Sequence, residues 1–339
     1  MIVSAMVDGT FLRRSGLFIQ LRGRDKRRHQ LAWKYAHKKL KINNPVIFTA
    51  HASFHGRTLA TITATGEPKY HKGFSLLMPA FHYVPYNDIG PLESAIAELD
   101  KNEWQVVAIL LEALQGEGRI FLGDVAYFQK ARELCDEKGI LLILNEVQVC
   151  MGHSGKWCGY ENLGIKPNIF TSAKGLGGGI PIGAMFCKSS CDVFGPSNHA
   201  SSFGGTPFVC AVALSVCQII ERENLLANLR ERGEQLRTGL KGIIAKHPYK
   251  FVEVSGWDLI NDLVLSEEWE VTSLDIVKAG IAEGLSTVRA SPRVLRFVPP
   301  LIVIAEKVDE ALTALLRTLY KEHFACSQFP IPNSPNDDY

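Results

Sequence analysis

Short runs of β-branched and aliphatic residues alternate with helical patterns from about residue 45 onward. Strands are predicted over Val46–Ala50, Val106–Leu111, Ile140–Leu144, Ile169–Ser172 and Ala184–Cys187. Apolar residues at helical spacing predict a helix over Val125–Lys138, which ends at Gly139 in a left-handed cap. Strand, helix and strand in this order form a parallel sheet with helices on its faces. The chain is therefore predicted to be an α/β protein with a mostly parallel sheet.

The pattern changes in the second half of the chain. A mostly buried helix is predicted over Phe208–Leu226 and a charged amphipathic one over Leu226–His247. Beyond them, strands and helices are predicted at Phe251–Val254, Leu259–Leu265, Ile276–Glu283, Val294–Val298 and Val308–Phe324. We therefore expect a large domain over residues 31–225 and a smaller α+β domain over 226–326. An atypical basic segment, 1–30, precedes them, and a disordered tail, 327–339, follows.

Composition excludes several classes of partner. The 37 basic and 35 acidic side chains leave a formal charge of +2, so no global field favours nucleic acid or an anionic membrane. The apolar stretch Phe208–Ile220 is too short to span a bilayer. The eight cysteines are scattered, with no Cys-x-x-Cys pair, which favours reduced thiols over a disulfide framework or a metal site.

Polar residues follow directly on two neighbouring predicted strands. Asn145 ends one strand, and Lys174 follows the next, bordered by Gly175 and Gly177–Gly179. Ligands of open α/β sheets bind at the carboxyl ends of the strands. A lysine among glycines can be approached closely by a cofactor, and its amine can react with a carbonyl group when it is desolvated. On these residues alone, a solvated loop lysine is the simpler interpretation.

The segment from Ile140 to Lys188 resembles the class-III aminotransferases that use pyridoxal phosphate, and within them the acetylornithine aminotransferase branch. Further blocks agree in order: Ser53–Leu59, Tyr83–Asp88, Leu111–Gly118, Ser202–Pro207 and Leu295–Leu301. Together the blocks cover about residues 32 to 325. The resemblance implies a fold-type-I pyridoxal-phosphate transferase that forms a homodimer and takes a small amino donor and a 2-oxo acid.

The resemblance also implies a role for each position that would meet the cofactor, pyridoxal 5'-phosphate. Lys174 would bind it covalently and then move a proton as general base and acid. Phe54 and Val147 would pack on the two faces of its ring, where as plain core residues they would be unremarkable. The ring nitrogen, ring hydroxyl and phosphate would be met by Asn145, Gln148 and Ser202, the last one contributed by the partner subunit.

Two arginines are the candidates for binding substrate carboxylates, because a guanidinium group matches a carboxylate in two parallel hydrogen bonds. By resemblance, Arg296 takes the carboxylate of glutamate next to the transferred amine, and Glu112 covers Arg296 when an ω-amino group enters. Arg57 would hold the carboxylate of an acylated ornithine. A surface salt bridge is the alternative for each arginine. His55 and Glu117 are expected to be structural.

The sequence departs from the family pattern at the ring nitrogen. The family has an aspartate at the position of Asn145, and an amide cannot stabilise a ring-nitrogen proton by charge, so the cofactor becomes a poorer electron sink. The alternative is that the amide fits the same space and still binds the cofactor by a hydrogen bond.

The second departure lies in the basic segment. Where the family has a Gly-x-Glu-x-Asn phosphate loop, this chain has Leu21–Gln30, and residues 1–41 hold eleven Lys and Arg against two acids. One permitted set of codons for Leu21–Gln30, read one base later, encodes Cys-Gly-Ala-Glu-Thr-Asn-Asp-Ala-Ile-Asn. A slipped frame or misplaced splice junction would therefore explain the segment. A mitochondrial presequence is the alternative, so both mitochondrial and cytoplasmic locations stay open.

These observations predict a transfer of the δ-amino group of an acetylornithine-like donor to 2-oxoglutarate, a step of arginine biosynthesis. Two alternatives remain. One is an aminotransferase for a different ω-amino donor in a specialised biosynthetic pathway. The other is a catalytically weak or inactive relative, for which Asn145 and the altered phosphate loop are the reasons.

Overall fold

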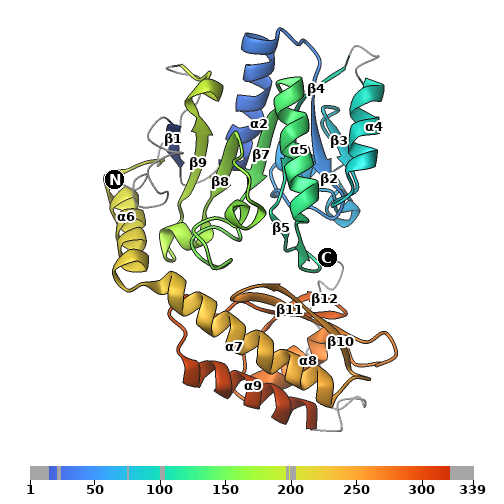
Figure 1. Ribbon diagram of the computed structural model, residues 1–339, viewed down its shortest axis with the longest axis vertical. Coiled ribbons are helices and arrows are strands. Elements are labelled where there is room, and N and C mark those ends of the chain that lie inside the picture. Colours follow the sequence, from blue (N-terminus) through green and yellow to red (C-terminus); the bar gives the residue numbers. More distant parts are fainter. Residues whose placement is uncertain are drawn as a thin grey trace.

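The computed structural model describes residues 15–20, 24–74, 76–99, 104–195, 198 and 204–320. Ser202 and the expected disordered tail, 327–339, lie outside these ranges. The described residues form two layered units, one around a seven-stranded sheet and one around a four-stranded sheet (Figure 1).

The large sheet is mostly parallel, as predicted. Its strands in spatial order are β1 (Ser15–Gln20), β9 (Gly183–Lys188), β8 (Ile169–Ser172), β7 (Leu141–Asn145), β4 (Gln105–Leu111), β2 (Pro45–Ala50) and β3 (Phe81–Val84). The five strands from β8 to β3 run parallel, whereas β9 is antiparallel to both β8 and β1. β5 (Leu114–Gln115) and β6 (Phe121–Leu122) form a separate two-stranded antiparallel sheet.

Helices cover both faces of this sheet because its strands are apolar on both sides. In β7, Leu142 and Leu144 pack in the same core as α4 (Ile89–Leu99) and α5 (Val125–Lys138). The alternate residues of β7, Leu141 and Ile143, pack in a second core with Leu31, Ala32 and Ala36, of which the first two lie in α2 (Arg24–Tyr35). The two cores lie on opposite faces of one sheet (Figure 1).

The helix predicted over Val125–Lys138 is confirmed with both of its ends. The Asp124 side chain accepts a hydrogen bond from the amide of Tyr127 at 2.8 Å and so caps the first turn. Gly139 ends the helix with a φ of +67°, a backbone conformation that glycine adopts without strain. The strand β7 begins two residues later, which fixes where the helix returns the chain to the sheet.

The second unit is antiparallel. Its strands in spatial order are β10 (Phe251–Trp257), β11 (Ile260–Leu265), β13 (Val294–Phe297) and β12 (Val288–Ser291). The helices α7 (Leu225–Lys246), α8 (Ser273–Ala282) and α9 (Ala305–Tyr320) pack against this sheet, and α6 (Pro207–Arg222) leads into α7 from the large unit (Figure 1). One further short helix, α3 (Leu59–Ala64), follows β2.

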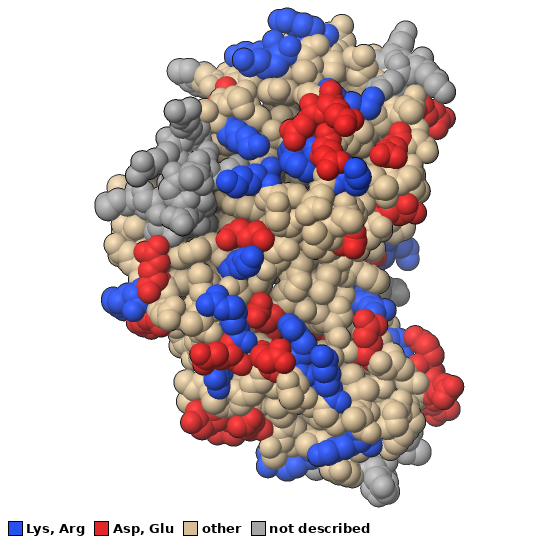
Figure 2. All heavy atoms as spheres, in the orientation of Figure 1, with Lys and Arg blue, Asp and Glu red and all other residues tan. Residues whose placement is uncertain are grey.

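Charges of both signs are interspersed over the face of the molecule shown in Figure 2, with no large area of one sign. This distribution agrees with the near balance of acidic and basic residues in the sequence. Among the described residues, no helix is long and apolar enough to cross a membrane.

Gly233 of α7 lies directly against the β10–β11 turn. A Cβ atom added there would lie 2.4 Å from the Cα atom of Asp258, so Gly233→Ala must push the helix away from the turn. We expect this substitution to lower the free energy of unfolding by about 1–3 kcal/mol in urea titrations followed by circular dichroism. Gly242→Ala, in the same helix with no atom within 4 Å of the added Cβ, should raise it by up to about 1 kcal/mol. Equal effects of the two substitutions would contradict this packing argument.

Candidate active site

Asn145 and Lys174 lie at the same edge of the large sheet, as predicted. Asn145 is the last residue of β7 and is paired with Thr171 of the parallel neighbour β8. Lys174 begins the short 3-10 helix Lys174–Gly177 just beyond β8, with an exposed side chain and a φ of +46°. A positive φ is uncommon for a residue with a side chain and is found where the surroundings impose it, often at functional sites. The turn therefore presents the Lys174 amine outward from the strand end.

The side-chain amide of Asn145 is held by three hydrogen bonds. Its Nδ2 atom donates to the Phe54 carbonyl oxygen at 2.9 Å and to Nδ1 of His55 at 3.2 Å. Its Oδ1 atom accepts from the backbone amide of Val147 at 3.3 Å. Both N–H groups of the amide are thus used within the protein, and only Oδ1 keeps a free lone pair. Asn145 can meet a ligand only as an acceptor.

His55 continues this hydrogen-bond chain into the protein. Because its Nδ1 atom accepts from Asn145, its proton lies on Nε2, which donates to Thr49 Oγ1 at 2.9 Å. The Thr49 hydroxyl donates in turn to the Ala64 carbonyl oxygen at 3.0 Å. Burial lowers the pKa of His55 well below its usual range, and the nearby Arg28 charge lowers it further. The ring is therefore neutral, and both of its nitrogens are hydrogen-bonded within the protein.

Glu112 lies beside Phe54 in the same cluster. Its Oε2 atom accepts from the Phe54 backbone amide at 3.0 Å, and the Tyr86 hydroxyl donates to its backbone oxygen at 2.8 Å. Burial raises the pKa of Glu112 to about 8, although the amide of Phe54 and the charges of Arg28 and Lys174 oppose the shift. At pH 7 most of the molecules therefore carry this carboxyl in its neutral form.

The backbone at Gly116 makes room for the Gln148 side chain. A Cβ atom added at Gly116 would lie 2.2 Å from Oε1 of Gln148, so only glycine lets the amide lie this close. Val147, the residue before Gln148, is half-buried. The strand ends β7 and β8 thus bring Val147, Gln148 and Lys174 to one edge of the sheet.

Arg57 and Arg296 lie in different environments. Arg57 is exposed, and its Cζ atom lies 4.1 Å from the centre of the Tyr70 ring and 5.7 Å from that of Phe54. Arg296 is buried in β13, and its Nε atom donates to Oδ1 of Asp262 at 3.3 Å. Asp262, and not Glu112, is thus the carboxylate that pairs with Arg296 in this structure.

Asp262 belongs to β11, whose register places it opposite Arg296. Burial raises the pKa of Asp262 to about 6, while the Arg296 charge and the backbone amide of Ile120 oppose the shift. Above that pH the pair is a buried salt bridge, whose desolvation cost limits its net contribution to stability.

Three residues of the site were not identified from the sequence, namely Tyr70, Asp262 and His153. Burial and the charge of Lys174 lower the pKa of His153 to about 4, so a neutral imidazole lies near the Lys174 amine. No sequence signal marks Tyr70 or Asp262. His153 lies in the segment between Asn145 and Lys174, and this position in the sequence is the signal that marks it.

Helix α2 reaches the base of this cluster. Arg28 is fully buried, and its two terminal nitrogens donate to Thr171 Oγ1 and to the His55 carbonyl oxygen, each at 3.2 Å. The next residue, His29, is also fully buried, against the edge of Phe81, and neither ring nitrogen has a hydrogen-bond partner among the described residues. The alternative reading frame would place alanine at position 28 and isoleucine at position 29, both suited to such burial.

The residues at the ring end of the site fit pyridoxal phosphate. An outward lysine amine, a half-buried aromatic ring, a fixed acceptor oxygen on Asn145 and the glutamine amide over Gly116 supply covalent, stacking and polar contacts. At the phosphate end, Ser202 and residues 21–23 lie outside the described ranges.

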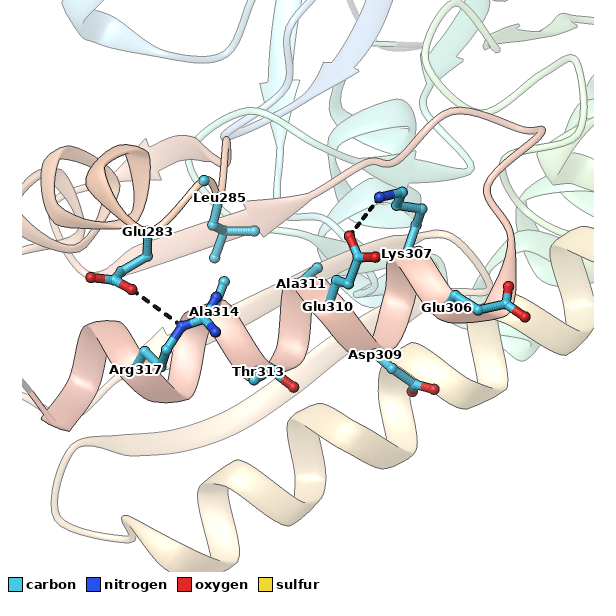
Figure 3. Close-up of a pocket in the computed structure, with 11 residues that line it drawn as sticks. Glu283, Leu285, Glu306, Lys307, Asp309, Glu310, Ala311, Thr313, Ala314 and Arg317 are labelled. Carbon is cyan, nitrogen blue, oxygen red and sulfur yellow. Dashed lines mark hydrogen bonds and ion pairs between the residues drawn. The ribbon is translucent and has the colours of Figure 1, made fainter.

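A separate groove of about 770 Å³ lies between the end of α8 and α9 (Figure 3). Arg317 pairs there with Glu283 at 3.2 Å, and Lys307 pairs with Glu310 at 2.6 Å. None of the residues that line it belongs to the cluster around Lys174.

Comparison with known proteins identifies relatives over most of the chain. The sequence model of the family described as aminotransferase class-III matches residues 28–319. The chain is 61% identical to an acetylornithine aminotransferase of Nostoc sp. over 290 residues, which are 86% of this chain and 68% of that protein. A protein of the same name from Thermosynechococcus vestitus is 59% identical, over 86% of this chain and 70% of that protein.

Solved structures agree in fold. The ornithine aminotransferase of Toxoplasma gondii superposes with a TM-score of 0.84 and 26% identity, over 90% of this chain and 73% of that one. A second structure of that enzyme is described as having partial occupancy of pyridoxal phosphate at its active site. The N-acetylornithine aminotransferase of Stenotrophomonas maltophilia superposes with a TM-score of 0.76 and 29% identity, over 94% of this chain and 77% of that one.

The burial of His29 leads to a stability prediction. His29→Ile removes two buried nitrogens that make no hydrogen bond, so it should raise the free energy of unfolding by about 1–3 kcal/mol. The gain should be larger at pH 5.5 than at pH 8. Burial lowers the pKa of His29 well below 6.5, so below that pH the unfolded wild-type chain takes up a proton that the folded chain does not.

Urea titrations at the two pH values measure this effect. His71→Ile is the matched control, because His71 Nε2 lies 2.8 Å from the Thr65 carbonyl oxygen and its loss should destabilise the fold by about 1 kcal/mol. A His29→Ile protein that is less stable than the wild type at both pH values would show that this histidine is satisfied in solution.

Proposed function

Because the chain belongs to the class-III aminotransferases, a family of pyridoxal-phosphate enzymes, we propose that it moves the ω-amino group of an acetylornithine-like donor to 2-oxoglutarate. The names and the high identity of the cyanobacterial relatives support this donor, and with it a place in arginine biosynthesis. The observation that carries the proposal is the position of Lys174 beside Asn145 at the carboxyl edge of the sheet.

In this proposal Phe54 and Val147 would pack on the two faces of the cofactor ring. Lys174 holds it covalently, Gln148 meets its hydroxyl group, and Ser202 of a second subunit meets its phosphate. The fixed orientation of the Asn145 amide supports a role at the ring nitrogen, since its Oδ1 atom is the only part of the amide left for a ligand. Bound there, the cofactor supplies an electron sink for the pair released when the amino-bearing carbon loses its proton.

Lys174 also moves the proton in this proposal. Its Nζ atom would, when deprotonated, take the proton from the substrate carbon and return it.

In this proposal each of the two arginines binds a different substrate carboxylate. Arg57 binds the carboxylate of the acylated donor, and Arg296 binds the carboxylate of glutamate or 2-oxoglutarate. Glu112 is proposed to cover Arg296 while the ω-amino group enters. That role requires Glu112 to leave the Phe54 amide, and Nη2 of Arg296 is a buried donor with no hydrogen-bond partner among the described residues.

We also propose a homodimer and a domain boundary near residue 225. Large apolar side chains at Leu59, Phe74, Leu76 and Phe208 are between 53 and 85% exposed, which supports a further protein surface covering them. The start of α7 at Leu225 supports a large domain over 31–225 and a small one over 226–326.

A weakly active relative is the second candidate function. The amide at Asn145 and the polar side chains that α2 buries at positions 28 and 29 favour it. The amide at Asn145 would lower the acidity of the substrate carbon. The polar side chains at positions 28 and 29 change the helix next to the expected phosphate loop.

Lys174→Ala tests the proposed function. We expect the wild-type protein, incubated with pyridoxal phosphate and then borohydride, to carry the label on the peptide that contains Lys174, and the variant to lose both the label and transamination. Lys156→Ala, an exposed lysine of the preceding loop, should keep both. Peptide mapping by mass spectrometry and a coupled glutamate assay measure the two outcomes. A label on another lysine would remove the assignment.

Asn145→Asp separates the two candidate functions. A carboxylate 3–4 Å from the ring nitrogen is worth about 4 kcal/mol at an effective dielectric constant of about 20. We expect the substitution to accelerate the half-reaction with the amino donor at least about tenfold, since about 1.4 kcal/mol is tenfold in rate. Part of the gain is lost because the His55 proton must move from Nε2 to Nδ1.

Stopped-flow absorbance of the loaded protein measures this rate. Asn168→Asp is the control, because Asn168 lies outside the site and its Oδ1 atom accepts from the Leu142 amide. An unchanged rate in a cofactor-loaded Asn145→Asp protein would show that the amide does not limit the reaction.

A further inference from the structure

Arg57 is held by aromatic rings rather than by a carboxylate. Its guanidinium carbon lies 4.1 Å from the centre of the Tyr70 ring, close enough for a cation–π interaction. The Tyr70 ring meets Phe54 edge to face, with centres 5.5 Å apart and planes at 71°. Phe54, which precedes α3, and Tyr70, which follows it, thus form a platform of two aromatic rings against Arg57.

This arrangement leaves the N–H donors of Arg57 available. Among the described residues, no carboxylate forms an ion pair with Arg57, whereas Arg296 already donates to Asp262. A ring face attracts the cation without accepting its in-plane N–H groups. The guanidinium fork can therefore meet an incoming carboxylate in two parallel hydrogen bonds.

Tyr70 is itself anchored at its other end. Its hydroxyl donates to Oε1 of Glu117, a residue of the loop between β5 and β6. Burial and the neighbouring Glu117 carboxylate raise the pKa of Tyr70, so the hydroxyl stays protonated and remains a donor. This hydrogen bond also occupies one oxygen of the Glu117 carboxylate. The ring is therefore fixed from Glu117 on one side and from Phe54 on the other.

We propose that Tyr70 is a positioning residue that orients Arg57 for the carboxylate of the amino donor. The inference rests on the proposed function, in which Arg57 binds that carboxylate. In addition, the inference states that the platform of Tyr70 and Phe54 determines which amino donors the protein selects. Donors with a carboxylate on the far side of the acylated nitrogen are recognised, and diamines without a carboxylate gain nothing from the platform.

Tyr70→Leu removes the ring and tests the proposal. Cation–π contacts of this kind are worth a factor of about 3 to 30 in binding. We therefore expect the KM for N-acetylornithine to rise about 3- to 30-fold, with kcat changed less than about twofold. Tyr70→Phe keeps the ring and loses only the bond to Glu117, so its KM should stay within about threefold of the wild type.

Two controls separate positioning from a general structural effect. Tyr249→Leu removes a tyrosine in the small unit whose ring also lies near a cation, with Lys250 Nζ 5.5 Å from its centre, and it should leave KM unchanged. With 1,4-diaminobutane as the donor, Tyr70→Leu should leave kcat/KM unchanged. A KM equal to that of the wild type, an equal loss with the diamine, or a Tyr70→Phe protein as weak as Tyr70→Leu would overturn the proposal.

Calorimetric titration with N-acetylnorvaline keeps this test independent of catalysis, because that compound has the carboxylate and acyl group but no transferable amine. Wild type should bind it, and Tyr70→Leu and Arg57→Ala should bind it about 3- to 30-fold or more weakly. If the wild type transfers no amino group yet shows this pattern, the proposed function fails and the role of Tyr70 stands. If the protein is active and its affinity for N-acetylnorvaline does not depend on Tyr70, the role of Tyr70 fails alone.

Discussion

The arrangement of the site depends on a chain of buried hydrogen bonds from Asn145 through His55 to Thr49. Asn145 ends β7 and Thr49 lies in β2, so the chain joins two strands that are separated by β4. Each group donates once to the next, ending at the Ala64 carbonyl oxygen, and this direction requires a neutral histidine with its proton on Nε2. A side chain that needs a donor from His55 would move the ring proton to Nδ1 and turn the Thr49 hydroxyl toward Nε2, which leaves the Ala64 carbonyl oxygen without this donor. The amide at Asn145 is therefore matched to the protons around it, and the Phe54 carbonyl is held by the same amide.

Helix α2 shows how helical geometry can bury polar residues. Ala32 and Ala36 are fully buried against the sheet. Since a helix returns to the same face about every four residues, position 28 faces the sheet as well. Arg28 and the neighbouring His29 are therefore buried whatever their polarity, and Arg28 reaches Thr171 and the site. Residues 27, 28 and 29 are all buried, and the alternative frame would make 28 and 29 apolar but place an aspartate at 27, so the fold and the codon argument agree at two of these three positions.

The two candidate carboxylate-binding arginines differ in how they are held, and the difference has chemical consequences. The ion pair of Arg296 with Asp262 uses the Nε donor, whereas the buried Nη2 atom has no hydrogen-bond partner among the described residues. Arg57 is exposed and lies on its aromatic platform with no ion pair among the described residues. The chain thus holds one cation on aromatic rings and one in a buried ion pair that engages only its Nε atom.

The sequence by itself determined the α/β fold, the helix at Val125–Lys138 and the placement of Asn145 and Lys174 at strand ends. These features follow from local periodicity, and from the rule that parallel strands end at one edge. It did not reveal α2, because basic residues in its first turns hide the apolar period of a core helix. Only the tertiary structure paired Arg296 with Asp262 and set Tyr70 against Arg57. Those contacts depend on the register of β11 with β13 and on the path of the loop after α3, and neither is encoded in the spacing of residues along the chain.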